Sequence, residues 1–146
     1  MLIAFSTSTS EAAYPKVLLE LERFGCNNKI VSFVLPLGYS FNLVGSMMYL
    51  TFASLFLAQA FNMHLSLWQQ TSMLLVLMLT SKGVAGVPRA ALVVIAGTMA
   101  MFNIPEAGLG LLIGIDPLMD MGRSATNVLG NAMTTAVISK WEGELN

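Results

Sequence analysis

The chain has 146 residues, of which 55% are hydrophobic and 10% are charged, and its formal net charge is −1. Soluble domains carry about 25% charged residues, so this composition, with a mean hydropathy of +0.72, indicates an integral membrane protein. The charge balance argues against a nucleic acid partner, and the single cysteine, Cys26, excludes an internal disulfide. One cysteine and one remote histidine offer neither a nucleophile–base pair nor a metal cluster, so the sequence predicts no enzyme.

Charged residues are absent from three stretches of the chain, residues 30–81, 90–105 and 124–139. A helix needs about 20 apolar residues to cross a bilayer. The first stretch is long enough for a full span and the other two are short, which predicts an all-α integral membrane protein. No long linker or low-complexity segment divides the chain, so residues 1–146 are interpreted as one domain.

The N-terminal part, residues 5–25, carries hydroxyl side chains at every position from 6 to 10. These residues are poor in helix interiors because their side chains compete for backbone hydrogen bonds. Glu11 and Pro15 then suit a first helical turn, and residues 16–23 form an amphipathic pattern. Two interpretations stay open for the hydroxyl run: the start of a capped surface helix, or a loop tip whose amides and hydroxyls face a ligand.

An apolar helix is predicted over residues 30–62, with interruptions at residues 36–38 and 42–46, where Pro, Gly and Asn gather. Within lipid, a broken helix persists only where protein or a water-filled site satisfies the freed backbone groups. Such breaks often mark an ion or substrate site in transporters. A glycine kink that serves packing alone is the alternative.

Two short apolar helices are predicted within residues 69–103, joined by a tip that contains Gly83, Gly86 and Pro88. Each helix has about a dozen residues and therefore spans about 18–20 Å, less than the hydrocarbon core of about 30 Å. Their length favours a re-entrant hairpin over a soluble helix-turn-helix.

A polar stripe lies within residues 107–140. At about 100° per residue, its five members fall within an arc of roughly 80° on one helix face. They are Asp116, Asp120, Arg123, Asn127 and Asn131. Residues 116–123 are also predicted to interrupt this helix, as residues 42–46 interrupt the earlier one. The chain then contains two halves in the same order of tip, helix and break, as in secondary transporters.

Five segments in this order resemble the dicarboxylate/amino acid:cation symporters, the glutamate transporter family. They are the serine-rich tip Ser8-Thr9-Ser10, the stretch Pro36-Leu-Gly-Tyr-Ser-Phe-Asn-Leu-Val-Gly-Ser46, the tip Gly83-Val-Ala-Gly-Val-Pro88, the core Asp120-Met-Gly-Arg123 and the closing Asn127-Val-Leu-Gly130. The resemblance covers essentially the whole chain.

The resemblance implies the C-terminal part of the glutamate transporter fold, built of re-entrant helical hairpins and broken transmembrane helices. Its parts would be the second arm of a first re-entrant hairpin (5–25), a broken transmembrane helix (30–62), a second re-entrant hairpin (69–103) and a broken transmembrane helix with the substrate stripe (107–140). Family members are much longer and trimeric. The chain is therefore expected to be a truncated core, multi-pass in the inner (plasma) membrane, that partners a separate N-terminal half or homologous subunits.

The implied activity is cation-coupled symport of acidic amino acids (glutamate or aspartate) or C4-dicarboxylates, with Na⁺ or H⁺ as the coupling ion and no other cofactor. Arg123 would bind a substrate carboxylate, for which its guanidinium fork is suited, and Asp120 would bind the ammonium group. An internal Asp120–Arg123 ion pair is the alternative. The implied substrate-binding residues are Ser10, Ser46, Val87, Asp120, Arg123, Ser124 and Asn127. The implied sodium ligands are Gly38, Ser40, Asn42, Ser81, Asn127 and Asn131.

Two positions depart from the family pattern. Val44 stands where the family usually has an aspartate that binds the cation, and Asn131 stands where many sodium-coupled members have an aspartate. A valine cannot coordinate sodium, so one cation site is predicted to be lost and another to carry less charge. The alternative function is accordingly a non-transporting membrane remnant or an interaction partner of a full-length or split homologue.

Overall fold

The computed structural model describes residues 1–84 and 90–145, and every regular element in these two ranges is a helix. The all-α class predicted from the sequence is therefore confirmed for this part of the chain. The one strand-like contact recorded there is an isolated bridge between Cys26 and Leu145, which joins the connector before α3 (Asn28–Phe41) to the C-terminal tail.

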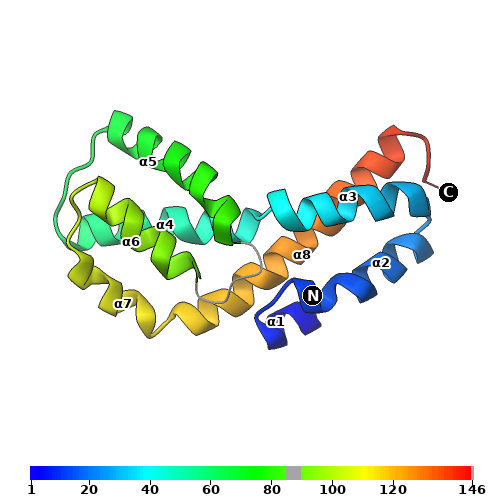
Figure 1. Cartoon of the computed structure of the whole chain (residues 1–146), viewed down its shortest axis with the longest axis horizontal. Coiled ribbons are helices and arrows are strands. Elements are labelled where there is room, and N and C mark those ends of the chain that lie inside the picture. Colours follow the sequence, from blue (N-terminus) through cyan, green and yellow to red (C-terminus); the bar gives the residue numbers. More distant parts are fainter. Residues whose placement is uncertain (85–89, 146) are drawn as a thin grey trace.

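One group of helices packs around the second half of the longest helix, α8 (Asp116–Trp141) (Figure 1). Its other members are α1 (Leu2–Thr7), η1 (Glu11–Ala13), α2 (Tyr14–Arg23) and α3. Their shared core contains Leu21, Val31, Leu35 and Val128, all buried. The buried positions of α3 recur every four residues, at Val31, Leu35 and Tyr39, so one face of that helix meets α8 while the other stays exposed.

A second group of helices packs around α4 (Val44–Ala60). Its other members are α5 (Leu67–Thr80), η2 (Ser81–Val84), α6 (Ala90–Met101), η3 (Glu106–Gly108) and α7 (Leu109–Ile113). The core of this group is aliphatic and includes Leu50, Leu57, Leu77, Ile95 and Met99, each fully buried. The two cores share no residue, and α8 contacts helices of both groups.

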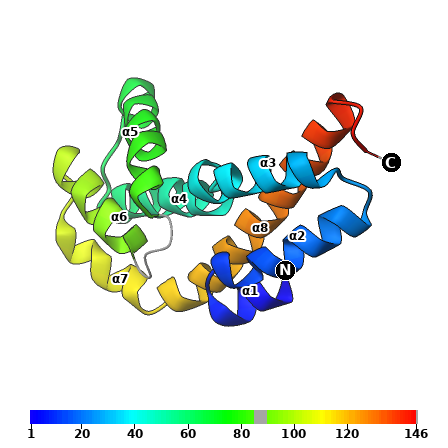
Figure 2. The ribbon, with the colours of Figure 1, turned by 45° about the vertical axis from the view of Figure 1, so that its right-hand side comes forward.

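The two groups lie at opposite ends of an elongated molecule (Figure 2). The helix α8 runs obliquely from α7 past α1 to lie beside α3, and the C-terminus ends next to the α2–α3 connector. The N-terminal turn of α4 meets the middle of α8 between the two cores, which is where the polar stripe is found.

The chain between α3 and α4 leaves the helical conformation at two residues, Asn42 and Leu43. This break lies at the second interruption predicted from the sequence. The first predicted interruption, at residues 36–38, is wrong, because α3 continues through Pro36 and Gly38. A proline removes one backbone hydrogen bond, and the burial of Leu35 and Tyr39 on either side holds the helix together despite that loss.

The predicted interruption at residues 116–123 is also wrong. Those residues form the first turns of the continuous helix α8, and the break lies just before it, at Gly114 and Ile115. Pro117 is in the first turn, where a missing amide hydrogen costs nothing, and Asp116 suits the positive end of the helix dipole. Among the charged side chains of the stripe, Arg123 bonds to Asp120, and Asp116 bonds to Tyr49 of α4.

The hydroxyl run at residues 6–10 is divided between two conformations. Ser6 and Thr7 belong to α1, where both hydroxyls donate to the Ile3 carbonyl, so these two residues lie in a helix despite their low preference for helix interiors. Ser8 takes a left-handed conformation with φ 55° and ends α1. Ser8, Thr9 and Ser10 form the turn between α1 and η1.

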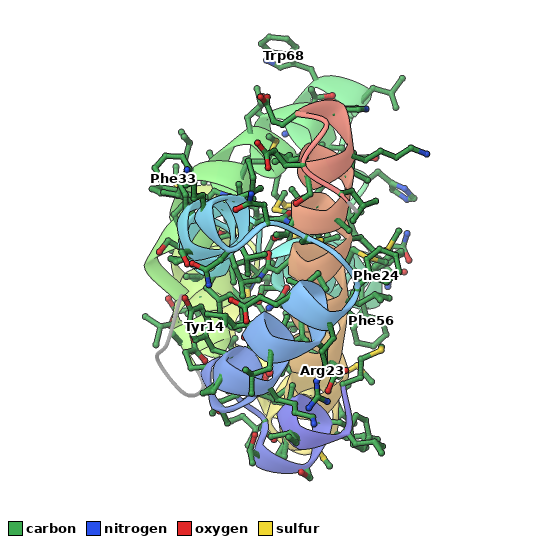
Figure 3. All side chains as sticks on the ribbon, turned by 90° about the vertical axis from the view of Figure 1, so that its right-hand side faces the viewer. Tyr14, Arg23, Phe24, Phe33, Phe56 and Trp68 are labelled. Carbon is green, nitrogen blue, oxygen red and sulfur yellow. The ribbon has the colours of Figure 1, made fainter. Side chains whose placement is uncertain are left out.

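By length and composition, one stretch within the described residues could cross a membrane, Asn28–Ala60, which comprises α3, the break and α4. The helices α5 and α6 are apolar but have only 14 and 12 residues. Large apolar side chains project from the surface of both groups. Phe33 and Trp68 stand away from the ribbon (Figure 3) and are 69% and 80% exposed.

Candidate functional site

The polar stripe of α8 places a buried guanidinium at the junction of the two cores. Arg123 is only 6% exposed. Its Nε donates a hydrogen bond of 2.8 Å to Oδ1 of Asp120, one turn earlier on the same helix. Its Nη1 is buried and has no hydrogen-bond partner among residues 1–84 and 90–145. A buried charge with an unused donor is costly, so this atom marks a position where an anion would be favoured.

A second carboxyl group, that of Asp116, lies close to the same guanidinium. Its Oδ1 accepts a hydrogen bond of 2.9 Å from the Tyr49 hydroxyl and lies 3.9 Å from Arg123 Nη1. The guanidinium carbon of Arg123 also lies 5.2 Å from the centre of the Tyr49 ring, within the range of a cation–π interaction. Tyr49 comes from α4, so both helices contribute to the environment of this charge.

Asn127, one turn after Arg123, binds the start of α4. Its Oδ1 accepts hydrogen bonds from the backbone amides of Gly45 (2.8 Å) and Ser46 (3.4 Å), and its Nδ2 donates to the Ser46 hydroxyl (3.1 Å). The first amides of a helix have no partner within the helix. Leu43, the N-cap residue of α4, offers no side-chain acceptor to these amides. Asn127, from another helix, therefore caps α4 in its place.

The approach of α4 to α8 requires glycine at position 45. A Cβ built there would lie 2.5 Å from the backbone oxygen of Arg123 and 2.9 Å from Cβ of Thr126. Those distances are shorter than real carbon contacts allow, so any larger residue would push the helix start away from α8. The glycine in the break segment therefore serves close helix packing.

A second polar position on α8 lies deeper toward the α3 end. Asn131 is 1% exposed, and both its Oδ1 and its Nδ2 lack hydrogen-bond partners among the described residues. It packs against Gly38 of α3, where an added Cβ would lie 2.8 Å from Asn131 Oδ1. A buried amide without partners costs free energy, which makes Asn131 a candidate ligand for something absent from this chain.

A hollow of about 270 Å³ lies at the break between α3 and α4. Among its lining residues are Asn42, Val44, Ser81 and Lys82. The Asn42 amide donates to Thr134 of α8 (3.1 Å), and the Lys82 ammonium donates to the Phe41 carbonyl at the end of α3. Val44 offers only hydrocarbon to this space. Most of the lining is apolar, and Asn42, Ser81 and Lys82 are the polar residues in it.

The remaining predicted site residues lie in varied surroundings. Ser10 and Ser124 are buried, Ser40 is exposed on α3, and the Ser81 hydroxyl donates to the Met78 carbonyl in its own turn. Val87 lies outside the described residues. The structure therefore brings Ser46 to Asn127 and Asp120 to Arg123, and brings Gly38 to Asn131, but it does not bring Ser40 into this group.

The family model described as the sodium:dicarboxylate symporter family matches residues 1–141. The chain belongs to this family. It is 47% identical over 146 residues to the proton/sodium-glutamate symport protein of Bacillus subtilis (strain 168). It is 48% identical over 147 residues to the C4-dicarboxylate transport protein of Pseudomonas syringae pv. syringae (strain B728a). The resemblance inferred from the motifs is thereby confirmed.

The symporter relatives are much longer than this chain. The two matches cover 100% of this chain but 34% and 33% of the relatives, and a C4-dicarboxylate transport protein of Erwinia tasmaniensis, 46% identical, is covered over 35% of its length. The chain therefore spans about a third of the length of the curated symporters that it matches.

Sequence reasoning missed three residues that contact the site. Tyr49 hydrogen-bonds Asp116, Thr134 accepts from Asn42, and Lys82 binds the Phe41 carbonyl. Tyr49 is one of many apolar or aromatic residues in its stretch, and nothing in the periodicity separates it from a packing residue. Thr134 lies about two helical turns after Asn127, so extending the stripe along α8 would have come close to it.

Proposed function

We propose that this chain forms the substrate-binding part of a cation-coupled symporter for acidic amino acids, glutamate or aspartate, or for C4-dicarboxylates. The observation that carries the proposal is the buried guanidinium of Arg123, whose Nη1 has no partner among the described residues. A planar donor fork with permanent charge suits bidentate binding of a carboxylate. Support also comes from the names of the relatives, which specify glutamate for some and C4-dicarboxylate for others.

Substrate binding would exchange one ion pair for two. The Asp120–Arg123 pair is present within the chain alone. A diacidic amino acid offers a carboxylate to Arg123 and an ammonium group to Asp120, so neither charge loses its partner. A plain dicarboxylate lacks the ammonium group and would leave Asp120 without one. The site thus favours amino acids. The other proposed substrate contacts are Ser10, Ser46, Val87, Ser124 and Asn127.

The coupling ion is proposed to be Na⁺ or H⁺. Sodium prefers oxygen ligands, and the proposed set consists of backbone, hydroxyl and amide oxygens. It comprises Gly38, Ser40, Asn42, Ser81, Asn127 and Asn131. The amide of Asn131, buried without hydrogen-bond partners among residues 1–84 and 90–145, supports a role of this kind for that residue. The exposed position of Ser40 is the weakest fit within the set.

We further propose that the chain lies in the inner (plasma) membrane as a multi-pass protein. The apolar stretch Asn28–Ala60 would form a broken span, and the short helices α5 and α6 would form a re-entrant hairpin. The proposed partners are an N-terminal half or homologous subunits, since the chain covers about a third of its relatives.

A second candidate is a membrane protein that binds acidic substrates without ion-driven transport, or that acts through association with a longer homologue. Val44 favours it, because a half-exposed valine faces the hollow where the family resemblance implies a carboxylate. The two candidates differ in uptake driven by an ion gradient, and both predict substrate binding.

The test uses the purified chain in proteoliposomes, with and without a co-expressed N-terminal half of a relative. Binding and uptake of glutamate, aspartate and succinate are measured under inward sodium or proton gradients. We expect Arg123→Cys to abolish binding, because the carboxylate loses the buried guanidinium that would bind it. Arg23→Cys is the matched control, since Arg23 is exposed and pairs with Glu20, and it should bind as the unmodified chain does.

Unchanged binding by the Arg123→Cys protein would show that the arginine is not the substrate ligand. Binding without gradient-driven accumulation, even with the N-terminal half supplied, would select the second candidate over the first.

A further inference from the structure

Two residues beside Arg123, Tyr49 and Asp116, have no role implied by the family resemblance. We propose that Tyr49 holds Asp116 back from Arg123, so that the guanidinium keeps a buried counter-charge while Nη1 stays available to a substrate carboxylate. Tyr49 and Asp116 are then positioning residues that act through the arginine. This inference rests on the proposed function and adds to it.

The geometry of a single oxygen atom carries the argument. Oδ1 of Asp116 accepts the Tyr49 hydroxyl at 2.9 Å, and the same oxygen faces Arg123 Nη1 at 3.9 Å. The shorter contact is a hydrogen bond and the longer one is an ion pair without a hydrogen bond. The hydroxyl bond anchors Oδ1 toward Tyr49, and in this position the oxygen lies about 1 Å beyond hydrogen-bonding distance from Nη1.

Removing that hydroxyl would leave Asp116 without a hydrogen bond. Its Oδ2 is already buried without a partner among the described residues, and the whole residue is 1% exposed. Charge-assisted N–H···O bonds close to about 2.7–2.9 Å. A shift of about 1 Å would therefore let Asp116 bind Nη1 directly and compete with an incoming carboxylate.

The arrangement also explains how the positive charge of Arg123 stays compensated while the substrate binds. In the proposed exchange, Asp120 leaves Arg123 for the substrate ammonium group. Asp116 does not need to move, so one carboxyl group remains near the guanidinium throughout. Breaking a buried pair without replacement is strongly unfavourable, and the Tyr49–Asp116 pair removes that cost without blocking the donor.

The substitution Tyr49→Phe isolates the hydroxyl from the ring. The guanidinium carbon lies 5.2 Å from the ring centre, and phenylalanine retains a face for the cation–π contact. Tyr39→Phe is the matched control. The Tyr39 hydroxyl is buried without a partner among residues 1–84 and 90–145, so its removal breaks no recorded hydrogen bond.

The first measurement needs no substrate. The arginines of the chain are Arg23, Arg89 and Arg123. In detergent-solubilised protein labelled with ¹⁵N-arginine, the Arg123 guanidinium resonances can be assigned by their loss in Arg123→Lys. We expect Tyr49→Phe to give a shifted, more slowly exchanging Arg123 Nη–H resonance, because a direct bond to Asp116 forms. In the double variant Tyr49→Phe/Asp116→Asn the shift should be smaller, since a neutral amide oxygen accepts a weaker hydrogen bond than a carboxylate.

The second measurement is the affinity of the same proteins for aspartate and succinate. One competing hydrogen bond to a charged group corresponds to about a tenfold loss of affinity in Tyr49→Phe. The double variant should recover most of that loss. Such a recovery is the signature of action through Asp116, and a general packing defect at position 49 would persist in the double variant.

Unchanged Arg123 resonances in Tyr49→Phe would overturn the inference, as would a loss of affinity that Asp116→Asn does not relieve. Failure of the unmodified chain to bind either acid would instead overturn the proposed function. In that case the resonances still decide whether Tyr49 holds Asp116 away from the arginine. Tyr39→Phe is expected to leave both measurements unchanged.

Discussion

Two polar regions lie along one face of α8, and they differ in whether their side chains have hydrogen-bond partners. Around Arg123 and Asn127, side chains from α8 and the start of α4 bond to one another across the helix junction. Around Asn131, one turn later, the amide is buried against Gly38 with no hydrogen bond among the described residues. The first region is organised within the chain, and the second is incomplete without another component.

The difference follows from what the neighbouring helix presents. At the first region, α8 meets a helix start, which supplies unpaired backbone amides. At the second, α8 meets the last turn of α3 at Gly38, whose carbonyl already accepts the Asn42 amide. The amide that faces a helix start finds partners, whereas the amide that faces this turn finds none among the described residues. The position of the α3–α4 break therefore decides which asparagine is satisfied.

The largest expected effect comes from separating α4 from α8 in the first region. Gly45→Ala would place a Cβ 2.5 Å from the backbone oxygen of Arg123. Overpacking against a backbone atom should lower the free energy of unfolding by about 3 kcal/mol, measured by thermal or denaturant unfolding in detergent. Gly97→Ala in α6 is the control, because its Cβ would have no neighbour within 4 Å.

The control should gain about 0.5–1 kcal/mol, the advantage of alanine over glycine inside a helix. Equal effects of the two substitutions would show that the tight junction between α4 and α8 does not exist in solution.

An intermediate effect is expected from removing the cap. Asn127→Ala deprives the Gly45 and Ser46 amides of their acceptor and should cost about 2 kcal/mol of unfolding free energy. Asn127→Asp keeps an acceptor at the helix start, loses the donor to the Ser46 hydroxyl and adds a buried negative charge, which the positive end of α4 favours. It should retain most of the stability. If both substitutions destabilise the protein equally, the capping role of the side-chain oxygen is wrong.

The smallest expected effect concerns the hollow at the break between α3 and α4. Val44→Asp adds a carboxylate to this hollow, which Asn42, Ser81 and Lys82 also line. We expect the protein to gain stabilisation by sodium, about 1.4 kcal/mol at a concentration ten times the dissociation constant, read as a higher Tm in NaCl than in choline chloride. Phe52→Asp adds the same charge two helical turns later, on an exposed face outside the hollow.

A sodium response in Val44→Asp and not in Phe52→Asp would support a cation site at the break. The same response in both variants would show that sodium only screens the added charge and binds no specific site.

Much of the first region could be predicted from the sequence. The 100° periodicity placed Asp116, Arg123, Asn127 and Asn131 on one face, and all four are buried. The break at Asn42 was predicted because that residue and Gly45 are poor in apolar helices. The breaks predicted at residues 36–38 and 116–123 were wrong, because local propensity cannot weigh a lost hydrogen bond against the burial of side chains on both sides. The partnership of Tyr49 with Asp116 left no periodic signal.

The sequence by itself determined that the chain is helical and which face of α8 is polar, because both depend on spacing along one chain. It also identified the family, because five motifs occur in order. Only the tertiary structure decided that Asn127 caps α4 while Asn131 stays without a bond, and that Tyr49 reaches Asp116. Those outcomes depend on which part of one helix contacts another. The distances between separate helices are set by packing, and a local sequence pattern does not encode them.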